Sequence, residues 1–282
     1  VKKQGLLVKN VVLGNALMDM YAKCGMLGKA RKVFDELPKR NVVSWNVLIV
    51  RYTQRGLSDE ALNCFKEMGQ QGICPVLGIF CTLQKVFVAM KATYEGQAMH
   101  CLLVKQGLDG ETLVANMFLD MYAKCGLLEE AQRVFVMLVA KDVSSWRGLI
   151  TAYAENGHVE EALSHFEEMQ CQGISPDVGT FLCCLKVCAI TGTLDKGQQI
   201  HSQITQNGFL ESDLRIGNAL VDMYAKCSEL VKAIAVFDEL KIRDTVSWNA
   251  LIMGYVIHGY SERAINCYEQ MQYEAIPPDS VT

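Results

Sequence analysis

Asparagine side chains recur at one position of a pattern that runs through the chain, and each has a second residue paired with it at the end of the same segment. Asn218 is paired in this way with Asp244, and Asn249 with Asp279. An asparagine amide carries both a hydrogen-bond donor and an acceptor, so a row of such amides could recognise the polar edges of a ligand. Asparagine is also a good helix N-cap. Because the pairs recur in register, we favour recognition over capping.

Other reactive residues form no arrangement that predicts catalysis or metal binding. Cys183, Cys184 and Cys188 lie close in sequence, but no CxxC pair or suitably spaced histidine completes a zinc ligand set. His100 and His201 occupy the same repeat position, which indicates packing or an interface. We therefore expect no catalytic residue, metal, cofactor or small-molecule substrate.

The asparagines belong to a long internal repeat. The stretch at 14–25 returns at 115–126 and at 217–228, with Asn15 and Asn116 separated by 101 positions and Asn116 and Asn218 by 102. Each long unit subdivides, and one register gives the complete repeats 11–41, 42–76, 77–111, 112–142, 143–177, 178–213, 214–244 and 245–279. Partial repeats occupy 1–10 and 280–282, so we expect the chain to be a fragment. We predict a single repeat array over 1–282.

Each repeat is predicted to form two helices. Ala30, Val33, Phe34 and Leu37 are spaced as the apolar stripe of an amphipathic helix, and equivalent residues recur in the later repeats. Alternating strand patterns are absent. A single helical hairpin cannot bury its apolar face alone, so the pattern predicts an all-α, right-handed superhelical solenoid of helix-turn-helix repeats.

The net charge, the apolar runs and the cysteine content limit the kinds of function that this chain could have. The net charge of −4 gives no global attraction to nucleic acid or to an anionic membrane, so any RNA binding must use a local basic stripe. No apolar run is long enough to cross a bilayer, and we expect no membrane association. The 12 cysteines sit at positions that favour free thiols in a reducing compartment.

The linker Gly173-Ile174-Ser175-Pro176-Asp177 and the cyclic order of 31-, 35- and 35–36-residue repeats resemble pentatricopeptide repeats of the PLS subclass. That subclass is found in plant organellar RNA-editing factors. The resemblance implies binding of single-stranded RNA, with about one base read per repeat. It also implies a chloroplast or mitochondrial location. Multiple organellar RNA editing factors are implied as protein partners on the long repeats 77–111 and 178–213.

The resemblance assigns base reading to the fifth and the last residue of a repeat, and base flanking to the second. The implied base-reading residues are Asn15 with Asn41, Asn46, Asn116 with Asp142, Arg147 with Asp177, Asn218 with Asp244, and Asn249 with Asp279. The implied flanking residues are Val12, Val43, Leu113 and Val246. In the family, Asn with Asp implies uracil and Asn with Asn a pyrimidine, which predicts the site 5′-Y-n-n-U-n-n-U-U. The repeats with Asn46 or Arg147 depart from the rule and are left unread.

Lys23, Lys124 and Lys226 occupy the thirteenth residue of the short repeats. A lysine there suits a phosphate, and it also complements the dipole at a helix end. Both interpretations stay open.

The resemblance implies that the whole protein directs C-to-U editing of organellar transcripts, with the chemistry supplied by a deaminase-like region or a partner outside this chain. The alternatives are an RNA-binding protein for transcript stability, splicing or translation, and a protein-binding helical scaffold.

Overall fold

The computed structural model describes residues 10–107 and 112–282, and every regular element in that part of the chain is an α-helix. The chain divides between Ala140 and Lys141 into two compact units, which are described one at a time. Unit 1 contains α1 (Val11–Lys23), α2 (Leu27–Asp35), α3 (Val42–Gln54), α4 (Ser58–Gln70), α5 (Leu77–Ala89), α6 (Thr93–Lys105), α7 (Thr112–Lys124) and α8 (Leu128–Met137). The predicted partial repeat 1–10, apart from Asn10, and residue Glu111 at the end of repeat 77–111 lie outside the described residues.

Unit 2 has the same plan of paired helices. It contains α9 (Val143–Glu155), α10 (Val159–Cys171), α11 (Val178–Thr191), α12 (Leu194–Gln206), α13 (Phe209–Ser212), α14 (Leu214–Lys226), α15 (Leu230–Glu239), α16 (Thr245–Ile257) and α17 (Ser261–Tyr273). The short helix α13 was not predicted, and it lies in the 36-residue repeat. The ring centroid of its Phe209 lies 5.7 Å from that of Phe181 on α11, so this short helix packs on its own repeat.

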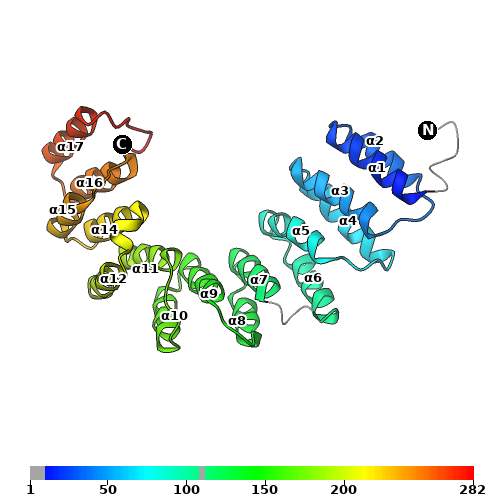
Figure 1. Ribbon diagram of the computed structural model, residues 1–282, viewed down its shortest axis with the longest axis horizontal. Helices are drawn as coiled ribbons and strands as arrows, with labels where there is room; N and C mark the ends of the chain where they lie inside the picture. Colours follow the sequence, from blue (N-terminus) through cyan, green and yellow to red (C-terminus); the bar gives the residue numbers. More distant parts are fainter. Residues whose placement is uncertain (1–9, 108–111) are drawn as a thin grey trace. The chain divides into compact units, whose positions relative to one another are not determined.

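The helices that open the repeats pack on one another within each unit. In unit 1, α1 contacts α3, α3 contacts α5 and α5 contacts α7; in unit 2, α9, α11, α14 and α16 form the same series. Each opening helix also packs against the second helix of its repeat, as the adjacent ribbons in Figure 1 show for α3 and α4. The predicted all-helical fold of repeated helical pairs is confirmed.

Sequence determines where the opening helices begin. All of them start at the first residue of a repeat as delimited from the sequence, and the last residue of the preceding repeat often supplies the N-cap. The side chains of Asn41, Asp142 and Asp244 each accept a hydrogen bond from the backbone N–H of a serine three residues later, which completes a capping box. Such a cap stabilises a helix by about 1 kcal/mol.

Aromatic side chains join successive repeats. Trp45 and Trp248 are almost fully buried at the fourth residue of α3 and α16. Each meets a phenylalanine of the previous repeat edge-on: the Phe34 and Trp45 centroids lie 4.5 Å apart, and the Phe237 and Trp248 centroids 4.8 Å. The core of each unit therefore continues from repeat to repeat.

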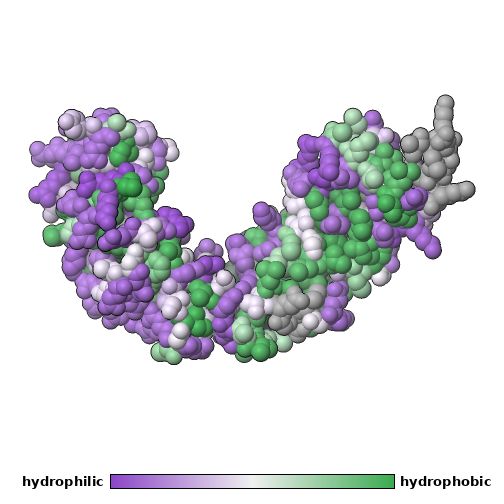
Figure 2. Space-filling view, viewed as in Figure 1, coloured by the Kyte–Doolittle hydropathy of each residue, from purple (hydrophilic) through white to green (hydrophobic). Residues whose placement is uncertain are grey.

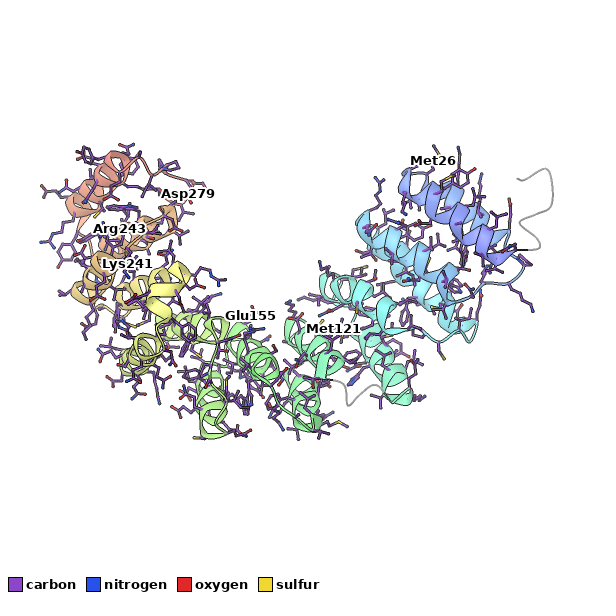
Figure 3. The ribbon with its side chains drawn as sticks, viewed as in Figure 1. Met26, Met121, Glu155, Lys241, Arg243 and Asp279 are labelled. Carbon is purple, nitrogen blue, oxygen red and sulfur yellow. The ribbon has the colours of Figure 1, made fainter. Side chains whose placement is uncertain are left out.

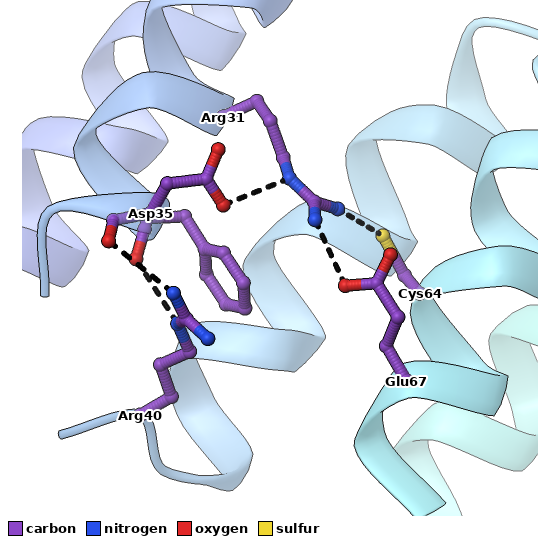
Figure 4. A network of polar contacts seen from close by, with 6 residues as sticks. Arg31, Asp35, Arg40, Cys64 and Glu67 are labelled. Carbon is purple, nitrogen blue, oxygen red and sulfur yellow. Dashed lines mark hydrogen bonds and ion pairs between the residues drawn. The ribbon is translucent and has the colours of Figure 1, made fainter. Parts of the chain in front are cut away.

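In unit 1 an arginine links the second helices of two successive repeats, α2 and α4 (Figure 4). Arg31 on α2 donates to Glu67 on α4 at 2.8 Å and to Asp35 at 3.1 Å. Arg40 donates to the carbonyl oxygen of Phe34 at 3.3 Å and lies over that ring, 4.8 Å from its centroid. Arg40 therefore gives a donor to a carbonyl group at the end of α2, where the last carbonyl groups of a helix have no partner within it.

Among the described residues, no helix is both long enough and apolar enough to span a bilayer. On the face shown in Figure 2, hydrophobic residues cover more of unit 1 than of unit 2. Some of the apolar content is therefore left on the surface, and part of it lies at the predicted flanking positions.

Candidate functional site

The amide of Asn218 is held by two side chains at the start of the next repeat. Its Nδ2 donates to Oδ1 of Asp244 at 3.1 Å, and its Oδ1 accepts from the hydroxyl of Ser247 at 2.7 Å. Asn218 is the fifth residue of α14, whereas Asp244 is the N-cap of α16 and Ser247 lies in its first turn. The helix cap is therefore the paired residue, and the asparagine itself lies inside a helix with its amide directed at the cap.

The same three-residue arrangement occurs at two more of the predicted pairs. In unit 1, Oδ1 of Asn15 accepts from the hydroxyl of Ser44 at 2.7 Å, and its Nδ2 lies 3.4 Å from Oδ1 of Asn41. At the end of unit 2, Asn249 donates to Asp279 at 3.0 Å and accepts from Thr282 at 2.6 Å. Figure 3 shows Asp279 in the segment that follows α17. The structure thus brings together these predicted pairs.

Ser44, Ser247 and Thr282 were missed by the sequence analysis. A signal was available, because a serine or threonine stands three residues after the paired polar residue in each of these cases. That spacing was not read as a capping box. Asp213 has no serine or threonine three residues later, because Ile216 occupies that position. Its carboxylate accepts from the guanidinium of Arg215 at 2.6 Å.

Hydrogen bonds keep the paired aspartates charged. Burial of Asp244 favours its neutral form, but the backbone N–H of Ser247 and the amide of Asn218 help to hold its pKa below the ordinary value. The backbone N–H of Val281 and the amide of Asn249 lower the pKa of Asp279 in the same way. An ionised carboxylate accepts hydrogen bonds only, so it requires the nitrogen end of each asparagine to face it.

The remaining predicted readers are held differently. Arg147 forms an ion pair with Asp177, and the hydroxyl of Thr180 donates to Asp177 at 2.7 Å. Asn46 is paired with Val76, and its Oδ1 is buried without a hydrogen-bond partner among the described residues.

Asn116 and Asp142 belong to different units. Asn116 lies on α7 of unit 1, where its Oδ1 is also buried and accepts no hydrogen bond within the described part of the chain. Asp142 caps α9 of unit 2. Base reading by this pair and by the other readers stays a prediction.

Two adjacent readers share one cavity of about 610 Å³ on unit 2. Its lining includes Asn218, Asn249, Asp244, Asp279, Val246 and Lys226. The predicted flanking side chains of both units are apolar and yet strongly exposed, at 75% for Val12, 54% for Val43, 64% for Leu113 and 56% for Val246. Exposed apolar side chains beside oriented polar groups suit a flat ligand that is contacted on its face and read on its edge.

Each lysine assigned to phosphate is exposed at the end of an opening helix. Each forms an ion pair with an aspartate one turn earlier: Lys23 with Asp19 at 2.7 Å, Lys124 with Asp120 at 2.8 Å, and Lys226 with Asp222 at 2.8 Å. A phosphate at these positions would share the lysine with a carboxylate. The phosphate role stays a prediction, and the aspartates show that the basic stripe is largely neutralised.

The long repeats carry no strong hydrogen-bonding group at the reader position. Cys81 is exposed, with its sulfur 3.8 Å from that of Met117, and Leu182 is half-buried. Cys184 and Cys188 are buried, and burial raises the pKa of both thiols, which makes them poor nucleophiles. Within the described ranges no cluster of histidine, cysteine or acidic residues has the grouping that could hold a metal ion.

Models of a known protein family match these repeats. A PPR repeat model matches residues 15–42, 43–73, 114–143 and 218–244, and a PPR repeat family model matches 141–190 and 243–282. The chain belongs to the PPR repeat family. The family resemblance seen in the sequence is thereby confirmed, while the PLS subclass stays a prediction.

Plant organellar PPR proteins are among the relatives. A mitochondrial pentatricopeptide repeat-containing protein of Arabidopsis thaliana is 36% identical over 283 residues, which is 100% of this chain and 27% of that protein. A second mitochondrial protein of that plant is 35% identical over 99% of this chain and 44% of its own length. A chloroplastic one is 34% identical over 99% of this chain and 35% of its own length. The chain thus spans less than half of each of these relatives.

A solved PPR structure supports the fold. The crystal structure of PPR10 in complex with an 18-nt psaJ RNA element superposes with a TM-score of 0.71. It covers 94% of this chain and 39% of the PPR10 chain at 24% sequence identity. At that identity the likeness establishes the helical-repeat fold of the PPR family for this chain.

Proposed function

We propose that this PPR chain binds single-stranded RNA in a sequence-specific manner, reading about one base per repeat and having no catalysis of its own. The observation that carries the proposal is the amide of Asn218, which is fixed by Asp244 and Ser247 and faces the cavity that it shares with Asn249. One hydrogen of its Nδ2 has no partner among the described residues, so it is available to an acceptor on a base edge.

The surroundings of Asn218 support a nucleobase as the ligand. Val246 exposes an apolar side chain beside the amides, which suits contact with the face of a base. Lys226 lies on the same cavity and supplies a positive charge for a backbone phosphate. The PPR10 structure was solved with bound RNA, which agrees with this assignment.

The proposal extends to the whole protein through the family. By resemblance to the PLS subclass, this chain is the recognition tract of a C-to-U RNA-editing factor of chloroplasts or mitochondria, and its site reads 5′-Y-n-n-U-n-n-U-U. Editing-factor proteins would bind the long repeats 77–111 and 178–213, where Cys81 and Leu182 replace a polar reader.

A binding titration tests RNA recognition. Fluorescence anisotropy is recorded with two labelled single-stranded RNAs: one carries the predicted pyrimidines, and the other has purines at those positions only. We expect tighter binding of the pyrimidine RNA. The difference should be smaller in an Asn218→Ala, Asn249→Ala double variant, in which only the readers Asn15 and Asn116 remain. Equal affinity of the wild-type chain for both RNAs would contradict the proposal, and the absence of any RNA binding would favour a protein-binding scaffold.

A further inference from the structure

A hydroxyl group contacts each reading asparagine that has a hydrogen-bonded polar partner. Ser247 contacts Asn218, Ser44 contacts Asn15, and Thr282 contacts Asn249. In all three cases the hydroxyl comes from the segment that begins the following repeat. Both serines are fully buried, so this contact is sheltered from water.

The neighbouring hydrogen bonds show which oxygen accepts the hydroxyl hydrogen of Ser247. The hydroxyl of Ser247 lies 2.7 Å from Oδ1 of Asn218 and 2.9 Å from Oδ1 of Asp244. Oδ1 of Asp244 already accepts from the N–H of Ser247 at 2.8 Å and from Nδ2 of Asn218. Oδ1 of Asn218 has no donor besides this hydroxyl among the described residues. The hydroxyl hydrogen is therefore best placed on the asparagine oxygen, because a buried carbonyl oxygen without a donor is costly.

Two repeats that depart from this arrangement agree with it, whereas the hydroxyl of Ser145, three residues after Asp142, donates to the backbone carbonyl oxygen of Asp142 at 2.8 Å. Ile79 takes the place of the hydroxyl residue after Asn46, and there Oδ1 of the asparagine is buried without a hydrogen-bond partner in the described part of the chain. Where the reader is Arg147, which has no acceptor, the hydroxyl of Thr180 turns to Asp177 instead. The hydroxyl therefore bonds to the asparagine in the three repeats where a reading amide also has a hydrogen-bonded partner at its nitrogen.

We propose that the base-reading unit contains a third side chain, the hydroxyl of Ser44, Ser247 or Thr282. This hydroxyl donates to the oxygen of the reading amide, which holds that oxygen against the following repeat and leaves an N–H donor as the group offered to the RNA. These are positioning residues, and the inference rests on the proposed function. Each such repeat then selects a base that presents an acceptor, such as a uracil carbonyl, and discriminates against bases that present a donor there.

The test compares Ser247→Ala with Ser247→Thr in the full chain. Affinity is measured for RNAs that differ only at the base assigned to Asn218, and separately at the base assigned to Asn249. We expect Ser247→Ala to reduce discrimination at the first base by about three- to tenfold, the value of one hydrogen bond, and to leave the second unchanged. The variant Ser247→Thr should keep the discrimination of the wild type, because a threonine, Thr282, makes the same contact with Asn249.

A gain-of-function variant keeps the test decisive if loss of the cap in Ser247→Ala unfolds the chain. Val76→Asp with Ile79→Thr builds the missing groups around Asn46, and Val76→Asp alone is the matched control. The double variant should acquire a preference for uracil at the base assigned to repeat 42–76, and the control a weaker one. The inference is overturned if Ser247→Ala discriminates like the wild type, or if the double variant gains nothing over its control. A wild-type chain without base preference would instead remove the proposed function itself.

Discussion

Nζ of Lys226 lies 2.8 Å from Oδ2 of Asp222, one turn earlier on α14, and both residues line the cavity that holds the amides of Asn218 and Asn249. Exposed ion pairs of this kind contribute only about 0–1 kcal/mol, so a phosphate could displace the carboxylate at little cost. The pair therefore leaves the lysine available while it reduces the attraction of the free protein for RNA of any sequence.

Lys226→Ala should weaken all RNA sequences about equally. Removal of one phosphate contact should flatten the dependence of log affinity on log salt by about 0.7 for a single strand. Affinity at several salt concentrations measures this slope. Asp222→Asn is the matched control and should strengthen binding, since it removes the competing carboxylate. An unchanged slope in Lys226→Ala would show that the lysine serves the helix end alone.

Asn249→Thr should move the preference at one base from uracil toward guanine, because threonine paired with aspartate implies guanine in the family. The change in relative affinity should be on the order of 1 kcal/mol at that base. Binding selections with the variant and the wild type measure it. Asn46→Thr is the control, since Val76 offers its reader no polar partner. A shift at any other base would mean that the repeat register is wrong.

Two nearby residues of α16 should differ in their effects: Trp248 should matter for stability and Val246 for RNA affinity. Trp248 is buried against Phe237, so Trp248→Ala should lower the free energy of unfolding by about 3–5 kcal/mol. Val246 is exposed, and Val246→Ala should change stability little while weakening RNA binding. Urea denaturation and anisotropy measure the two quantities. Loss of stability in Val246→Ala without loss of affinity would contradict the flanking role.

His201 should make stability depend on pH. Burial lowers its pKa from the ordinary value of 6.5, against a smaller opposite effect of Glu239, and Nδ1 lies 2.9 Å from the hydroxyl of Tyr224. Because the unfolded chain binds the proton more readily, stability is complete above pH 6.5 and falls as the pH drops through the folded-state pKa. Urea denaturation between pH 7.5 and about 5 should show a shallower slope for His201→Gln. Identical slopes would exclude this histidine as the cause.

The sequence predicted the helical layout well because one apolar stripe recurs in every repeat. The opening helices begin at Val11, Val42 and Leu77, and so on through the chain, as the register required. The short helix α13 was not predicted because its four residues, Phe209–Ser212, are too few to show a helical period.

The candidate site was only partly predictable. Asn218 and Asp244 could be paired from the sequence because both recur in register. The hydroxyl of Ser247 could not be assigned to Asn218, since the contact spans 29 residues and depends on how α14 packs against α16. Likewise, Asp222 was visible one turn before Lys226, but its partial neutralisation of the basic stripe emerged only from the side-chain geometry.

An unbiased selection of single-stranded RNA bound by the wild-type chain tests the central claim most directly. We expect uracil at the two adjacent bases assigned to Asn218 and Asn249, with a pyrimidine at the base assigned to Asn15 nearer the 5′ end. Enriched RNAs without a base preference at those positions, or with purines there, would contradict it.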